Sequence, residues 1–150
     1  MKRFRFPLHP VAVIRAHAEL RARESLADSL RACAAAEWHM ESWQRRLSDA
    51  EARIAEHRIE IFNGADVASQ LHAYRADCAA SDEAAAALRD ARAAMQKRRE
   101  EYIEANRALK VIENAEARAR QEHRNESARA EQAEIDEFAG RKSFQGPASQ

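Results

Sequence analysis

The chain has 150 residues, of which 25 are basic and 25 are acidic, and only 6% are aromatic. A formal net charge of zero gives no reason to expect non-specific nucleic-acid binding. One third of the residues are charged and alanine is abundant, which is typical of long helices rather than of a compact layered core.

The N-terminal 24 residues are locally basic, with an excess of arginine and lysine over Glu19 and Glu24. The apolar run at residues 11–14 is too short for a signal peptide and is closed by Arg15. No apolar segment approaches the roughly 20 residues that span a bilayer. With only two cysteines, the protein is expected to be soluble and cytosolic.

A heptad repeat predicts one long helix over about residues 10–62. The repeated apolar positions are Leu26, Cys33, Met40, Leu47, Ile54 and Ile61. Pro10 suits the first helical turn, and Asn63 with Gly64 suits a left-handed C-terminal cap. We therefore expect a turn over 63–66.

A second apolar seam predicts a helix over about residues 67–139, capped by Asp66 and followed by a flexible tail at 140–150. A tight turn between two amphipathic helices predicts an antiparallel coiled-coil hairpin, all-α and a single domain over 1–150. Pairing Ile61 with Val67 also places Met40 opposite Leu88, and the second helix then outruns the first by about twenty residues, roughly 30 Å. In this register Cys33 and Cys78 lie roughly 25 Å apart, too far for a disulfide.

No sequence motif indicates catalysis. The six histidines form no His-Glu-x-x-His unit, and no Cys-x-x-Cys, glycine-rich phosphate loop or Gly-x-Ser-x-Gly occurs. We therefore expect no catalytic residues, no metal and no cofactor. We expect the histidines to be solvated on helix faces.

The basic run at residues 97–99 is followed by Glu100, Glu101 and Glu104, which favours a solvated face over nucleic-acid binding. Trp38 falls on the face away from the partner helix. Either it contacts another protein, or it is one of the few apolar residues that any protein surface exposes.

Both ends of the chain resemble the FliJ family of flagellar type III export proteins. The opening "FRFPLHPVAVIRAHAE" contains Phe4, Phe6 and Arg15 in the family's F-x-F-x-L start. The closing "EQAEIDEFAGR" is similar to the family's last segment through Gln132, Ile135, Asp136, Phe138 and Arg141. With the Asn-Gly turn between them, these segments extend the resemblance over nearly the whole chain.

The resemblance implies a noncatalytic cytoplasmic stalk similar to the central stalk of rotary ATPases. The implied partners are the flagellar export ATPase ring, the export gate protein and export substrate chaperones, with membrane association at the flagellar base only through these partners.

The family's gate contact lies in the first turns of the second helix, where this chain has Asp77, Ser81 and Ala84 instead of larger apolar residues. Trp38 is therefore the expected gate contact. The expected partner-binding residues are Phe4, Phe6, Arg15, Trp38, Gln132, Ile135, Asp136, Phe138 and Arg141. The alternatives are the equivalent stalk of a virulence-type secretion system and a generic coiled-coil scaffold.

Overall fold

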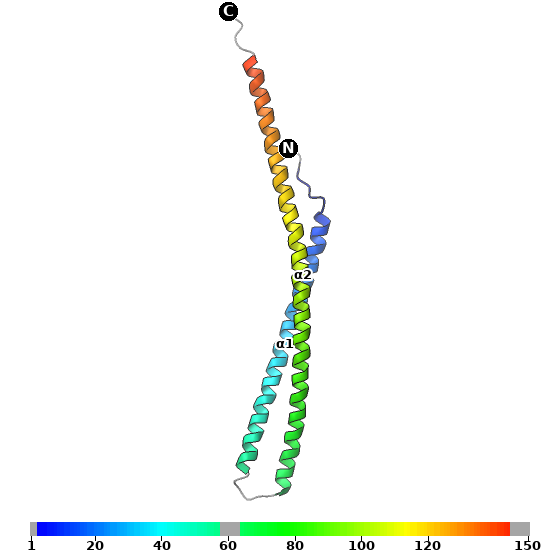
Figure 1. The fold of residues 1–150 in the computed structure, drawn as a ribbon, viewed down its shortest axis with the longest axis vertical. Coiled ribbons are helices and arrows are strands. Elements are labelled where there is room, and N and C mark those ends of the chain that lie inside the picture. The colour runs from blue at the N-terminus through cyan, green and yellow to red at the C-terminus, as the bar shows by residue number, and fades with distance from the viewer. Residues whose placement is uncertain (1–2, 58–63, 145–150) are drawn as a thin grey trace, which may run out of the picture. The chain divides into compact units, whose positions relative to one another are not determined.

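The described residues form two long helices that pack against each other as a hairpin, as predicted (Figure 1). The computed structural model describes residues 3–57 and 64–144, with side chains over 3–56 and 64–140. Helix α1 spans His9–His57 and helix α2 spans Gly64–Phe144. No strand occurs in these described ranges.

The helix boundaries differ from the prediction mainly around the turn and at the C-terminal end. Gly64 is the first residue of α2, so it starts the second helix, and Asp66 lies in the first turn of α2 rather than before it. Residues 58–63, which include Asn63, lie outside the described residues. At the other end α2 continues through Gly140, which is exposed, because an exposed helical glycine costs only about 1 kcal/mol. The single domain over 1–150 stays a prediction.

Helix α1 begins where the sequence predicts it. The Ala12 N–H donates to the Leu8 carbonyl at 3.0 Å, and the His9 N–H donates to the Phe6 carbonyl at 3.2 Å. Pro10 lies in this first turn, where a missing N–H leaves no helical hydrogen bond unmade. The chain therefore turns tightly at residues 6–9 as it enters α1.

The chain divides into two compact units, each containing a stretch of both helices. Unit 1 combines residues 1–19 with 105–150, and unit 2 contains residues 20–104.

Polar pairs within unit 2 show that its helices are antiparallel, because early α1 residues meet late α2 residues. These pairs are Glu37 with Arg92 at 2.9 Å, Arg46 with Asp77 at 3.0 Å, and Glu51 with Tyr74 at 2.6 Å. Met40 and Leu88 line one groove, as the predicted register requires. The Tyr74 hydroxyl donates to Glu51 and lies near Cys78, and these contacts raise the pKa of Tyr74 to about 12.

The interior of unit 2 consists of small side chains. Among the described residues, the most buried are Cys33, Ala50, Ser81 and Ala84, each less than 9% exposed. Small residues at these positions allow the two helix backbones to lie close together. The cysteines Cys33 and Cys78 are both free, as the register predicted.

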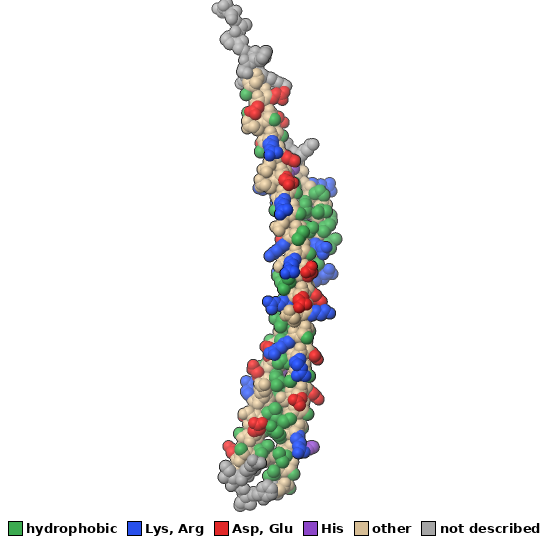
Figure 2. All heavy atoms as spheres, viewed as in Figure 1, with side chains coloured by type: hydrophobic (Ala, Val, Ile, Leu, Met, Phe, Trp, Pro, Cys, Tyr) green, Lys and Arg blue, Asp and Glu red, His purple; other side chains and the backbone are tan. Residues whose placement is uncertain are grey.

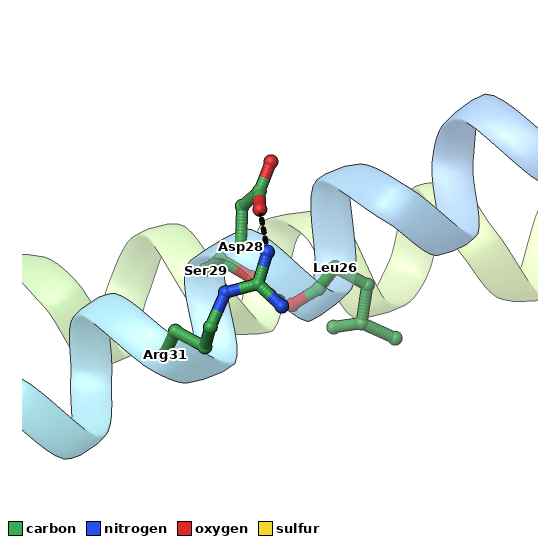
Figure 3. A network of polar contacts seen from close by, with 4 residues as sticks. All are labelled: Leu26, Asp28, Ser29 and Arg31. Carbon is green, nitrogen blue, oxygen red and sulfur yellow. Dashed lines mark hydrogen bonds and ion pairs between the residues drawn. The ribbon is translucent and has the colours of Figure 1, made fainter.

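Ser29, a polar residue at the seam, makes its side-chain hydrogen bond within its own helix. The Ser29 hydroxyl donates to the Leu26 carbonyl at 2.8 Å, and Arg31 pairs with Asp28 on the same turn (Figure 3). Such bonds to a preceding carbonyl let serine occupy a half-buried helical position. The seam therefore tolerates Ser29 without a partner from α2.

Candidate partner-binding site

The N-terminal arm, which we define as residues 3–7, lies on α2 in unit 1. The ring of Phe4 contacts His123 edge-on, with centroids 5.5 Å apart and planes at 66°. The Arg120 guanidinium lies 5.6 Å from the Phe4 ring centroid, within the range of a cation–π contact. Phe4 is therefore held by two side chains of α2.

Exposure alternates along the arm, as it does along an extended strand. Phe4 and Phe6 are half-buried, whereas Arg3, Arg5 and Pro7 are exposed. Both phenylalanines thus face α2 and both arginines face outward. The arm places its apolar side chains on the helix and its charges at the rim.

The arm covers part of α2 beyond residue 118. In the predicted register, α1 ends there and would leave this part of α2 uncovered. An extended segment advances about 3.3 Å per residue and a helix about 1.5 Å, so five arm residues span roughly eleven helical residues. Accordingly Ala119, His123 and Ser127 are half-buried. The prediction of an uncovered overhang is wrong for this stretch, and it holds only from residue 128 to residue 140, where every residue is exposed.

A shallow groove runs beside the arm on α2. The α2 residues that line it with Arg3, Phe4 and Arg5 are Ala119, Glu122, His123, Glu126, Ser127, Ala130, Glu131 and Glu134. We call these eight α2 residues the arm groove. Its wall is acidic and its floor is made largely of small side chains, whereas the arm is basic and aromatic.

Apolar side chains are exposed at the start of α1. Leu8, Val11, Val13 and Ile14 are between 36% and 64% exposed. Figure 2 shows hydrophobic side chains gathered over these first turns, next to basic side chains. Arg15, which follows this group, is exposed as well. A cluster of this kind is a common feature of protein-binding surfaces.

The C-terminal part of α2 carries a second exposed apolar pair. Ile135 is 61% exposed and Phe138 is 64% exposed, and three-residue spacing places them on neighbouring positions of one helix face. Gln132 donates to the Asp136 carboxylate at 2.8 Å one turn apart. We call Gln132, Ile135, Asp136 and Phe138 the C-terminal patch.

The two tryptophans of unit 2 differ in environment. Trp38 is 65% exposed, in agreement with its predicted outward position. Trp43 is half-buried, donates to His39 at 3.2 Å, and lies 5.0 Å from the Arg46 guanidinium. An exposed tryptophan on an otherwise polar face is a typical contact point for another protein.

Asp77, Ser81 and Ala84, the three positions where larger apolar residues were expected, lie on the inner side of unit 2. Ser81 and Ala84 are buried, and Asp77 is half-buried in its ion pair with Arg46. Their small or charged character therefore follows from close helix packing.

The described residues contain neither a group of metal-binding side chains nor a membrane-spanning helix. In residues 3–57 and 64–144, no three histidine, cysteine or acidic side chains gather as a metal site would need. Neither described helix contains a stretch apolar enough to cross a membrane.

The comparison with protein families matches almost the entire chain. The family model described as "Flagellar FliJ protein" matches residues 4–147, including both terminal motifs. The chain belongs to the FliJ family. Searches of curated proteins and of solved structures found no significant match. Membership in FliJ gives this chain a role related to flagellar protein export.

The predicted site residues of this FliJ protein fall into separate groups. Phe4 and Phe6 are seated on α2, whereas Arg15 and Trp38 are exposed on α1. Gln132, Ile135, Asp136 and Phe138 come together in the C-terminal patch. Arg141 lies within α2, but its side chain is outside the described part of the chain. Glu134 of the arm groove and Phe138 of the C-terminal patch are four residues apart, so the groove and the patch adjoin on one face of α2.

Sequence reasoning missed the α2 residues that receive the arm. His123 was expected to be solvated, but it is half-buried against Phe4. The available signal was the small residues Ala119, Ser127 and Ala130, which continue the seam beyond the last large apolar residue of the repeat. This signal indicates a covered face, although it does not identify the covering segment.

Proposed function

We propose that this FliJ-family protein is a noncatalytic, stalk-like binder of the flagellar export ATPase ring that also contacts the export gate and escorts substrate chaperones. It acts in the cytoplasm and reaches the membrane at the flagellar base through these partners. The proposal takes the family's role in export and assigns its contacts to surfaces of this chain. The C-terminal patch, the arm and Arg15 are assigned to the ATPase.

The observation that carries this proposal is the exposed stretch of α2 over residues 128–140. A helical stretch whose side chains are all exposed gains little stability from the burial of apolar surface. This stretch also exposes two large apolar side chains, Ile135 and Phe138. A surrounding protein collar would bury both side chains and cover the exposed stretch. An ATPase ring that holds this stretch fits both requirements.

The first test is binding to the purified export ATPase of the same organism. The full chain should bind the ATPase and raise its turnover several-fold, whereas a chain cut after residue 130 should do neither. Turnover is measured at saturating protein, and binding is measured by pull-down. An ATPase whose turnover does not change at saturating amounts of the full chain would contradict the proposal. If the cut chain still bound the ATPase and raised its turnover, the contact would lie outside residues 131–150.

Trp38 is the proposed contact for the export gate protein. Truncating a buried interface tryptophan commonly costs 2 kcal/mol or more, so Trp38→Ala should weaken gate binding by about thirtyfold. Binding to the ATPase should stay unchanged. Leu30→Ala is a matched control because Leu30 is 50% exposed on the same helix. Equal gate affinities for the Trp38 variant and the unmodified chain would exclude Trp38 from this contact.

A further inference from the structure

We propose that the arm groove is a binding site for an extended basic and aromatic peptide segment of a partner protein, and that the N-terminal arm occupies this site in cis. The arm shows which chemistry the groove accepts, since its Phe4 ring packs on α2 with an exposed arginine on either side in the sequence. This inference goes beyond ATPase and gate binding, because it assigns a further ligand class to the arm groove.

Charge is segregated around the groove in a way that favours a basic ligand. Glu122, Glu126, Glu131 and Glu134 line the groove. Arg118, Arg124 and Arg129 also belong to this stretch of α2, but they lie outside the groove lining, and the Arg120 guanidinium lies over the Phe4 ring. A segment that keeps its arginine or lysine side chains at the rim, as the arm does, therefore lies beside these carboxylates. Such complementarity favours the correct partner and speeds association.

The floor of the groove provides a place for an aromatic ring. Phe4 rests against His123 and under the Arg120 guanidinium, and the neighbouring Ala119 leaves space beside it. Ser127 and Ala130 continue the same surface toward the C-terminus with small side chains. Once the arm has left, a segment with two aromatic residues two positions apart, as in the arm, can thus enter the groove.

The arm holds the groove by few contacts, so a competing segment can displace it. Its two phenylalanines are only half-buried, and its arginines are exposed. A short tether nevertheless gives the arm an effective concentration in the millimolar range, which a free ligand must overcome. Occupation in cis therefore lowers the apparent affinity of the groove for any partner segment.

The test uses the full chain and a fluorescein-labelled peptide with the arm's own sequence, KRFRFPL. Binding is followed by fluorescence anisotropy to the unmodified chain and to the arm variant Arg3→Glu/Phe4→Ala/Arg5→Glu. The arm variant, whose groove is empty, should bind the peptide at least tenfold more tightly than the unmodified chain. Raising the salt from 50 to 500 mM should weaken this binding.

Control variants identify the site of peptide binding. Adding Glu122→Gln and Glu126→Gln to the arm variant should reduce its affinity for KRFRFPL at least fivefold. Glu100→Gln with Glu104→Gln has the same spacing on α2 outside unit 1 and should have no effect. A peptide with both phenylalanines changed to alanine should bind at least fivefold more weakly. Circular dichroism checks that helix content is unchanged, and Phe4→Ala alone serves as a milder second variant.

Three results would overturn the proposal. The first is no peptide binding by either arm variant at millimolar concentration. The second is equal affinity of the unmodified chain and the arm variants. The third is an unmodified chain that sediments as a dimer while the arm variant sediments as a monomer, because the occupant would then be the arm of a second copy. None of these measurements involves the export ATPase, so the two proposals fail or stand independently.

Discussion

Replacing Ala84 by leucine should lower the free energy of unfolding by about 1–3 kcal/mol, the usual cost of forcing extra methylenes into a packed interior. Ala84 is 4% exposed, and the other buried residues of unit 2, Cys33, Ala50 and Ser81, are small as well. A leucine at this position has no space between the two helices, so it must push the backbones apart and expose the seam. The loss is measured as a lower midpoint in thermal or urea denaturation, followed by circular dichroism.

Ala87→Leu is the matched control for this substitution. Ala87 belongs to the same alanine run but is exposed, so its leucine variant should unfold within about 0.5 kcal/mol of the unmodified protein. Both variants add the same side chain to the same helix and differ only in the face that carries it. If Ala84→Leu proved as stable as Ala87→Leu, the close approach of the two helices at Ala84 would be refuted.

Changing both Ile135 and Phe138 to aspartate should weaken binding to the export ATPase by at least thirtyfold, or about 2 kcal/mol. Under the proposed function these two apolar side chains become buried against the ring, and a buried unpaired carboxylate is strongly unfavourable. The stability of the free protein should not fall, because both side chains are more than 60% exposed in it. Binding is measured by titration, and stability by thermal denaturation.

Val111→Asp is a suitable control because Val111 is 66% exposed on the same helix. It introduces one of the same charges at an equally exposed apolar position outside the C-terminal patch. This variant should bind the ATPase normally. Retained affinity in the Ile135 and Phe138 variant would remove the C-terminal patch from the interface, and equal losses in both variants would point to a general effect of added negative charge.

The heptad repeat was sufficient to predict the hairpin and its register. Periodic positions such as Met40 and Leu88 identify one face on each helix, and only an antiparallel pairing buries both faces within one chain. The boundary at Gly64 was less predictable. A glycine can cap one helix or open the next, and the choice depends on contacts that local sequence does not contain.

The arm on α2 could not be predicted from periodicity. Residues 3–7 form no helix, so no repeat connects Phe4 with His123, and their sequence separation is large. Extended segments are also longer per residue than helices, which is why the arm reaches Ser127 although the helical register stops near residue 118. The C-terminal patch was identified only through the resemblance to FliJ, because exposed apolar residues on a charged helix carry no periodic signal.

The interior of small side chains has an evolutionary consequence. In the part of the chain that the structure describes, no side chain is completely buried, so few positions are constrained by the core. A hairpin of this kind tolerates wide sequence divergence as long as its repeat survives. Selection then acts chiefly on residues that other macromolecules touch, and family members are expected to share a pattern of positions more than an identity of residues.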